Sequence, residues 1–302
     1  MDIPSAEATR DPAVALPSAP RRPRSVVRAY LLLPHAVPVL VVMTATAGFA
    51  IFFDAGAPPA ATFTRLLLAM LGGQIAIGAI NEVVDAGLDT AAKPWKPIPA
   101  GLIAVPTAIT IAAVSLVLMA FMSATLGTAS LLLCSVGTAT GLAYDLWFKR
   151  SLWSWLPYLV ALPLLPIWVA TALDAFNPRL LMLYPLGALA VIGVHLSQAL
   201  PDVASDRAAG IRSLSSQLGP RRTLVGCWGA TLTAPLLALL AAPVLAERPG
   251  IVSGAAIAVG ALIGLNGMLY AVRPRAGVMA CFPCVAISTV LMGLGWVVAV
   301  GN

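Results

Sequence analysis

Charged residues are scarce in this chain: they make up 10% of its 302 residues, whereas hydrophobic residues make up 60%. Histidine and cysteine are also rare, with two and four residues, and there is no G-x-G-x-x-G stretch, Walker loop or nucleophile elbow. The sequence therefore lacks the fingerprints of dinucleotide-binding, P-loop and serine-hydrolase sites. Cys281 and Cys284 form a C-x-x-C without further Cys or His nearby, so we interpret the cysteines as small packing residues.

A lipid bilayer is the solvent that this composition indicates. The mean hydropathy is +0.93, and the chain divides into apolar runs of roughly 20 residues, the length that a membrane-spanning helix requires. We therefore predict an all-α polytopic membrane protein with nine transmembrane helices. The expected spans lie near residues 30–53, 63–84, 102–125, 127–147, 153–174, 179–200, 223–245, 251–271 and 277–300.

The distribution of basic residues predicts the orientation of these spans. If the N-terminus is cytoplasmic, all basic residues except Arg65, Arg179 and Arg248 lie on the cytoplasmic side, as the positive-inside rule requires. We therefore expect a multi-pass protein of the cell membrane with a cytoplasmic N-terminus and an active site facing the cytoplasm. The net charge of +6 then reflects topology and the anionic inner leaflet, and we expect no nucleic-acid partner.

The first residues differ in composition from the rest of the chain. Residues 1–26 are rich in proline and alanine, carry scattered charges and lack the apolar core of a secretory signal. We expect them to form a disordered cytoplasmic tail without cleavage. Residues 27–302 are expected to form one transmembrane domain.

Two polar triplets with the same spacing stand at the ends of long apolar runs. In chain order their members are Asn81, Asp85, Asp89, Gln198, Asp202 and Asp206. On a helix, steps of four residues place each triplet along one face. Carboxylates beside hydrocarbon and at a helix C-terminus are unfavourable unless a cation compensates them. Two such faces turned toward each other would form a cage of hard oxygen ligands, which suits Mg²⁺ shared with the oxygens of a diphosphate.

Each triplet closes an even-numbered span and is followed by a basic loop, which indicates two four-helix repeats plus a ninth helix. Binding sites of repeated membrane proteins commonly lie between the halves. A third basic stretch lies between the fourth and fifth spans. The basic side chains of the three loops could bind phosphate, although any one of them could equally be a topology anchor. They include Lys93, Lys96, Lys149, Arg150, Arg207 and Arg212.

Four motifs follow one another along the chain. N-x-x-x-D-x-x-x-D at residues 81–89 is followed by K-P-x-x-P-I-P-x-G at residues 93–101. Y-x-x-x-x-K-R occupies residues 144–150, and D-x-x-x-D-R-x-x-G-x-R-S-L occupies residues 202–214. In this combination and order, the motifs resemble those of the UbiA superfamily of intramembrane prenyltransferases. The resemblance runs from about Tyr30 to the C-terminus.

The resemblance implies a nine-helix bundle whose central cavity opens to the cytoplasmic side and, laterally, to lipid. It also implies a Mg²⁺-dependent enzyme that ionises an isoprenoid diphosphate, transfers the prenyl group to an aromatic or lipidic acceptor and releases pyrophosphate. Lys149 and Arg150 would contact the diphosphate oxygens. The expected metal ligands are Asn81, Asp85, Asp89, Asp202 and Asp206.

Residues from all three loops are therefore candidates for the site. We expect catalysis to depend on Asp85, Asp202 and Tyr144. The residues expected to bind substrate are Asn81, Lys93, Lys96, Lys149, Arg150, Gln198, Arg207 and Arg212.

Three positions depart from the pattern of many superfamily members. Lys96 replaces the arginine of an R-P pair, so a point charge stands where a bidentate fork is common. The pair Gln198 and Ala199 replaces Asn-Asp, which removes one carboxylate. Leu33 replaces an arginine that is common in members with acidic aromatic acceptors. A benzoate-like acceptor is therefore less favoured, although Arg28 lies nearby in the sequence and could take the place of the missing arginine.

Aromatic faces could stabilise an allylic cation in such a cavity, by ~0.5–2 kcal/mol each, and Tyr144, Trp147 and Trp168 are candidates. The alternative, which we favour for any one of them, is interfacial anchoring or core packing. His35 and His195 are likewise interpreted as hydrogen-bonded polar residues rather than bases. His195 precedes the second triplet by about one helical turn and could face the cavity.

Three functions are compatible with these residues. The first is a prenyltransferase, and the second is a terpene cyclase on the same scaffold that quenches the cation internally. The third is a transporter, which repeated halves would also allow, but paired D-x-x-x-D faces at one membrane surface favour an enzyme. The expected partners are an isoprenoid diphosphate, a small or lipidic acceptor and membrane lipid.

Overall fold

The computed structural model describes residues 29–30, 33 and 35–300. Within these residues the chain is helical and contains no strand, which agrees with an all-α membrane protein. The tail expected over residues 1–26 and the nearby Arg28 lie outside the described residues.

Long helices follow the expected spans closely. They are α2 (Ala36–Phe53), α3 (Ala60–Ala92), α4 (Val105–Ala124), α5 (Thr128–Ala143), α6 (Leu156–Ala172), α7 (Leu183–Ala199), α10 (Pro220–Leu245), α11 (Pro249–Val272) and α12 (Pro274–Val300). Shorter elements join them. These are the π-helical turn η2 (Tyr144–Phe148), the 3₁₀ turns η3 (Pro178–Met182) and η4 (Leu200–Asp202), and the helices α8 (Val203–Ala208) and α9 (Leu214–Leu218).

The described residues contain eight helical segments long and apolar enough to cross a bilayer. The remaining expected span corresponds to α6, which has only 17 residues. This helix packs against α2, α5 and α7, and none of its residues is exposed. That α6 is the ninth transmembrane span therefore stays a prediction.

The first polar triplet lies on one helix, as its spacing predicts, because α3 continues about two turns beyond residue 84. The second triplet lies on a continuous helical run, Pro178–Ala208, that is not α-helical throughout, so its placement along one face stays a prediction. Gln198 lies near the end of α7, Asp202 in η4 and Asp206 in α8. Pro201 has no N–H to donate and its ring clashes with a continuing α-helix, so the chain tightens into the 3₁₀ turn.

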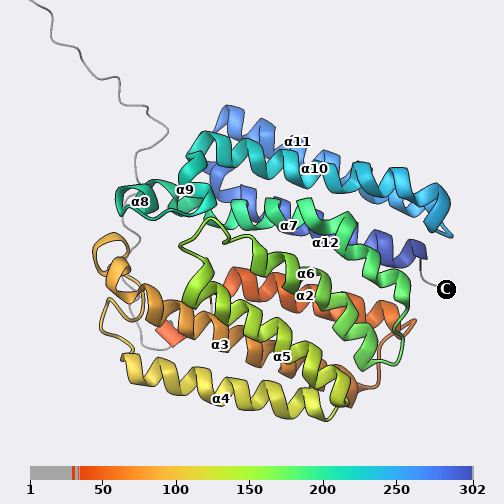
Figure 1. The fold of residues 1–302 in the computed structure, drawn as a ribbon, viewed down its shortest axis with the longest axis horizontal. Helices are drawn as coiled ribbons and strands as arrows, with labels where there is room; N and C mark the ends of the chain where they lie inside the picture. Colours follow the sequence, from red (N-terminus) through yellow and green to blue (C-terminus); the bar gives the residue numbers. More distant parts are fainter. Residues whose placement is uncertain (1–28, 31–32, 34, 301–302) are drawn as a thin grey trace, which may run out of the picture.

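The long helices lie side by side in two groups with α6 between them (Figure 1). In the first group, α3 packs against α2, α4 and α5. In the second, α10 packs against α7, and α11 against α12. Helix α12 also meets α2, so it closes the bundle between the groups. That the chain consists of two four-helix repeats plus a ninth helix stays a prediction.

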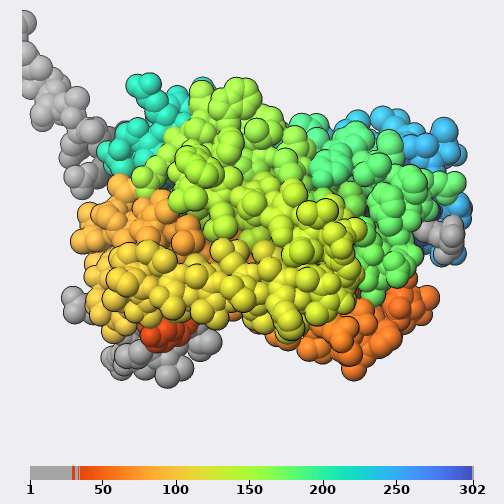
Figure 2. Space-filling model, turned by 60° about the horizontal axis from the view of Figure 1, so that its bottom comes forward, coloured from red at the N-terminus to blue at the C-terminus, as the bar shows by residue number. Residues whose placement is uncertain are grey.

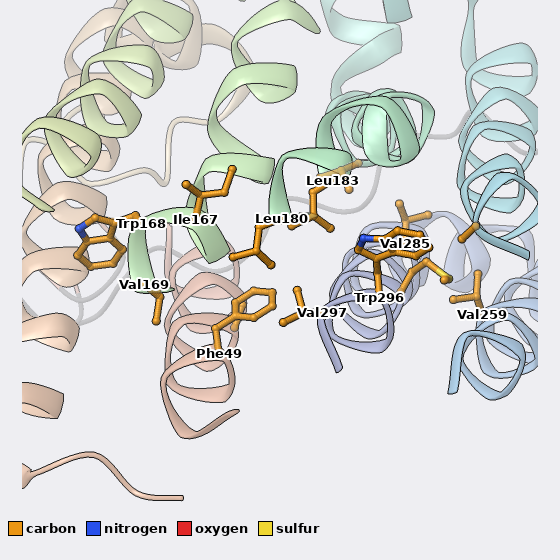
Figure 3. Packing of buried hydrophobic residues seen from close by; sticks show 14 of the residues in the cluster. Phe49, Ile167, Trp168, Val169, Leu180, Leu183, Val259, Val285, Trp296 and Val297 are labelled. Atoms are coloured by element: carbon orange, nitrogen blue, oxygen red, sulfur yellow. The ribbon is translucent and has the colours of Figure 1, made fainter. Parts of the chain in front are cut away.

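A cluster of buried apolar side chains fills the interior between these groups (Figure 3). It includes Phe49 of α2, Trp168 of α6 and Trp296 of α12. The indole N–H of Trp168 donates to Ser130 Oγ at 2.9 Å, so Trp168 is a core residue, as the favoured alternative predicted. The thiols are free; those of Cys134, Cys227 and Cys281 are buried and that of Cys284 partly so.

Helix α4 covers much of the molecular face shown in Figure 2, where it appears in yellow. Its outward side chains are apolar: Val114, Val117 and Phe121 are each more than 60% exposed. In water such a surface would be unfavourable, whereas in a bilayer it faces hydrocarbon. The outside of the bundle is thus apolar, as expected for an integral membrane protein.

Two glycines allow α3 to pack closely against its neighbours. A Cβ atom at Gly72 would lie 2.7 Å from the backbone oxygen of Ser115, and one at Gly73 would lie 2.7 Å from Thr138 Oγ1. The contact at Gly72 is with backbone, which cannot rotate aside. The separation of α3 and α4 therefore depends on a missing side chain at this position.

Replacing this glycine provides the first test. We expect Gly72→Ala to push α3 from α4 and to destabilise the protein by ~1–3 kcal/mol, a typical cost of overpacking. Thermal unfolding of the detergent-solubilised protein measures the effect. Gly264→Ala is the control, because a Cβ atom at this α11 position meets nothing within 4 Å. Equal melting temperatures for the two variants would contradict the close packing at Gly72.

Candidate active site

The motif-bearing segments gather at one end of the bundle, on the left in Figure 1. The loop after α3, the chain between α5 and α6, and the helices α8 and α9 all lie there. These are the three basic loops that the sequence singled out. Segments far apart in the sequence therefore contribute to one polar region.

One ion pair joins the two aspartate motifs. Lys93 follows the last residue of α3, and its Nζ atom lies 2.5 Å from Asp202 Oδ1 in η4. The backbone N–H of Lys93 donates to Asp89 O at 2.7 Å and so ends the helix. The end of the first motif is thus connected to the second through Lys93.

Asp85 is neutralised by the basic pair that follows η2. Lys149 Nζ lies 2.6 Å from Asp85 Oδ2, and Arg150 Nη2 lies 3.4 Å from Asp85 Oδ1. Arg150 Nη2 also donates to Val84 O at 3.2 Å. The structure therefore brings together three residues that the sequence assigned to the site.

Asp145 belongs to the same cluster, although the sequence analysis did not select it. Its carboxylate is buried and accepts from Asn81 Nδ2 at 2.5 Å. Lys149 Nζ lies 3.7 Å from the same Asp145 oxygen. The other oxygen, Oδ2, is buried without a hydrogen-bond partner. The available signal was its position four residues before Lys149, which places both on one helical face.

Glu82 is a second residue that the sequence analysis missed. It is only 1% exposed, and its Oε1 atom lies 2.7 Å from Lys96 Nζ and 3.1 Å from His35 Nε2. Lys96 Nζ also lies 2.7 Å from Asp89 Oδ2. Burial opposes the charge of Lys96, but the carboxylates of Glu82 and Asp89 outweigh it and raise the pKa of the amine. His35 is thus a polar partner of Glu82, as interpreted.

Gln198 and Tyr144 lie in an aromatic cluster next to the carboxylates. The Tyr158 hydroxyl donates to Gln198 Oε1, and the rings of Tyr144 and Tyr158 meet edge to face with centroids 5.1 Å apart. His195 is buried, with Nε2 3.0 Å from Ser154 Oγ, as expected for a hydrogen-bonded polar residue. Tyr158 lies inside an apolar span, and no pattern in the sequence marked it.

Other expected site residues are less closely engaged. Within the described part of the chain, Asp206, Arg207 and Arg212 form no ion pair. The Arg207 guanidinium lies against Gly219, and Arg212 lines an open cavity together with Arg150. Trp147 is 71% exposed, which favours the anchoring alternative for this residue.

The described residues hold no group of three or more Asp, Glu, His or Cys side chains close enough to bind a metal ion. Amines separate the carboxylates instead: Lys96 lies between Glu82 and Asp89, and Lys149 lies between Asp85 and Asp145. The donor set nevertheless suits Mg²⁺, because it consists of carboxylate and amide oxygens. The unpartnered Oδ2 of Asp145 adds a buried oxygen that lacks a compensating contact. The five metal-ligand assignments stay a prediction.

The buried pair of Glu82 and Lys96 generates the second test. Lys96→Met leaves Glu82 with a buried charge, so we expect a loss of ~3–5 kcal/mol in unfolding free energy. In the double variant Glu82→Gln/Lys96→Met both charges are absent, and much of the stability should return. Arg179→Met is the control, because Arg179 and Glu247 form an exposed pair whose loss costs only ~0–1 kcal/mol. The unfolding free energy is measured in detergent. An equal loss in the single and the double variant would contradict this prediction.

Comparison with known proteins places the chain in a family. The model of the UbiA prenyltransferase family matches residues 41–282. A digeranylgeranylglyceryl phosphate synthase of Korarchaeum cryptofilum (strain OPF8) is 29% identical over 196 residues, which cover 62% of this chain and 68% of that relative.

Solved structures have the same fold. A UbiA homologue from Archaeoglobus fulgidus bound to GPP and Mg²⁺ has a TM-score of 0.67 at 18% identity, with 89% of this chain and 99% of that chain covered. An apo UbiA homologue from Aeropyrum pernix K1 has a TM-score of 0.65 at 19% identity, with 86% and 97% covered. The family match extends over most of the chain and includes all four motifs in full. The chain therefore belongs to the UbiA prenyltransferase family.

Proposed function

We propose that this protein transfers the prenyl group of an isoprenoid diphosphate to a hydroxyl group of a lipidic acceptor, with Mg²⁺ as cofactor. The observation that carries the proposal is the ion pair between Lys93 and Asp202, at 2.5 Å. It joins two aspartate motifs from separate parts of the chain at one end of an apolar bundle. Family membership and the relative that makes a glyceryl phosphate lipid support the reaction and the acceptor class.

The reaction requires stabilisation of a leaving diphosphate. The bond between the allylic carbon and the diphosphate oxygen breaks, and pyrophosphate keeps the electron pair. An acceptor oxygen then forms the new bond to carbon and loses its proton. When bound, Mg²⁺ supplies positive charge to the diphosphate oxygens. Lys93, Lys96 and Lys149 already lie among the carboxylates, and they can bind diphosphate oxygens as point charges.

The carboxylates have two tasks in this proposal. Asp85, Asp89, Asp202 and Asp206, with Asn81, are the oxygen ligands that would hold Mg²⁺. Asp85, Asp89 and Asp202 also hold lysines in position. Binding of a metal diphosphate would replace contacts between carboxylate and amine by contacts between carboxylate and metal and between amine and phosphate.

Apolar surroundings protect the allylic cation from water. An apolar cavity of about 110 Å³ lies inside the bundle and is bordered by Phe49, Leu162, Met292 and Trp296. It provides a site for part of the prenyl chain. Tyr144 precedes Asp145 in η2 and its ring meets that of Tyr158, so these ring faces could stabilise the cation.

Leu33 supports a lipidic rather than an acidic aromatic acceptor. Its side chain is only 1% exposed and packs in a small apolar cluster with Ala76 and Ile103. A buried leucine offers no charge to a benzoate group. A hydroxyl-bearing lipid does not need such a charge at this position.

Substitution of the motif aspartates tests the proposal. We expect Asp85→Asn or Asp202→Asn to lower turnover by about two orders of magnitude or more, because a neutral amide is a poor substitute for a carboxylate that holds both metal and amine. Asp54→Asn is the control, since Asp54 follows α2 and is exposed. Prenyl transfer and pyrophosphate release are measured together, with and without chelator. Near-normal transfer in either motif variant would refute the proposal, whereas pyrophosphate release without any acceptor would favour a terpene cyclase.

We further propose that the site faces the cytoplasm, as the distribution of basic residues predicts. Ala92 ends α3 beside the site, and Ala57 lies in the connection between α2 and α3; both are exposed. A cysteine at Ala92 should react with an impermeant thiol reagent only in inside-out vesicles, and one at Ala57 only in right-side-out vesicles. The parent protein, with its native cysteines, gives the background. Labelling of both positions from the same side would contradict the topology.

A further inference from the structure

A second polar region lies next to the paired carboxylates. The chain between α5 and α6 and the segment around α9 border an open cavity of about 560 Å³. Its lining residues are Arg150, Ser151, Leu152, Trp153, Arg212 and Gln217. Two guanidinium groups line this cavity, and no carboxylate is among its lining residues. It therefore differs in charge from the aspartate motifs beside it.

Arg150 connects the cavity with the first aspartate motif. Its Nη2 atom lies 3.2 Å from Val84 O and 3.4 Å from Asp85 Oδ1. A guanidinium group carries five N–H donors in a planar fork, so one edge can hold Asp85 while other donors face the cavity. Arg212 forms no ion pair with a carboxylate in the described part of the chain, and its charge is available to a ligand.

The charge of the cavity indicates a phosphate group as its ligand. The planar fork of an arginine matches two oxygens of one phosphate. A diphosphate with its metal ion would need oxygen ligands for that metal, and the lining residues supply no carboxylate. The cavity is therefore suited to a phosphate that binds without a metal ion.

The rim of the cavity indicates that this phosphate belongs to a lipid. Leu152 and Trp153 are 54% and 61% exposed, and tryptophan is enriched where a membrane protein meets the lipid headgroups. An apolar rim next to two arginines suits an amphipathic ligand. Its phosphate would lie in the cavity and its hydrocarbon part along the bilayer.

We propose that this cavity binds the phosphate of the prenyl acceptor, so that the acceptor is a membrane lipid with a phosphate monoester. This inference rests on the proposed function and narrows its acceptor. It assigns Arg212 to the acceptor rather than to the isoprenoid diphosphate, and it places Arg150 between the two substrates. Anionic phospholipids and free phosphate offer similar chemistry, so the experiment has to separate these sources.

Binding is measured on the full-length protein in nanodiscs of zwitterionic lipid, without Mg²⁺ or isoprenoid diphosphate. The probes are a prenylglyceryl phosphate, the same lipid without its phosphate, phosphatidylglycerol and inorganic phosphate. Tryptophan fluorescence reports binding, and Trp153→Phe identifies the contribution of the rim residue. We expect the prenylglyceryl phosphate to bind most tightly of the four.

Two arginine variants provide the comparison. Arg212→Gln should weaken binding of the prenylglyceryl phosphate about ten- to a hundredfold, as the loss of a charged hydrogen bond predicts. Arg221→Gln is the matched control, because Arg221 is exposed at the start of α10 and does not line the cavity. In the reaction, Arg212→Gln should raise the KM for the phosphorylated acceptor and leave the KM for the isoprenoid diphosphate unchanged.

Several results would overturn the proposal. One is that Arg212→Gln raises the KM for the isoprenoid diphosphate and not the KM for the acceptor. Another is that phosphatidylglycerol or inorganic phosphate binds as tightly as the prenylglyceryl phosphate. A third is that Arg212→Gln and Arg221→Gln bind the prenylglyceryl phosphate equally well. Failure of the proposed function gives a different result. If the parent protein transfers no prenyl group but still binds the phosphorylated lipid through Arg212, the phosphate site is supported and the transferase proposal is refuted.

Discussion

A carboxylate beside hydrocarbon is costly unless a cation neutralises it, and this requirement explains the arrangement of the polar end of the bundle. The acidic residues of α3 lie in its last three turns, and the amines that pair with them come from two loops. Lys96 holds the proline-containing loop after α3 against its own helix. Lys149 brings the chain after η2 to the same helix, and Lys93 reaches η4. Charge neutralisation therefore positions the loops as well as the carboxylates.

The same pairs are suited to exchange of partners. A lysine beside two carboxylates keeps one of its two contacts when a ligand replaces the other. The same is true of a carboxylate beside two cations. Asp85 contacts both Lys149 and Arg150, and Lys96 contacts both Glu82 and Asp89. Glu82 differs from the motif aspartates, because it is enclosed and its partners hold the loop in place. The motif aspartates can thus take part in binding while Glu82 maintains the local structure.

Sequence patterns predicted the parts of this site that depend on local geometry. The spacing of Asn81, Asp85 and Asp89 places them on one helix, and α3 has this form. Pro201 was visible in the sequence, but the four-residue spacing around it was read as a regular α-helix, whereas the structure has the 3₁₀ turn η4 at this point. Glu82, Asp145 and Tyr158 were missed because their roles depend on contacts with residues far away in the chain. Single-sequence periodicity carries no information about such pairs.

Helix α6 has a consequence for the relation between protein and membrane. Its 17 residues extend about 25 Å at 1.5 Å per residue, less than the ~30 Å of a typical hydrocarbon core. A lipid-facing helix of this length would thin the bilayer around it, but α6 packs against α2, α5 and α7 and has no exposed residue, which reduces this mismatch. The outer helices can match the bilayer while the centre of the bundle does not. The surface of the protein can thus be indented over α6, and a headgroup can move below the level of its neighbours without deforming the membrane.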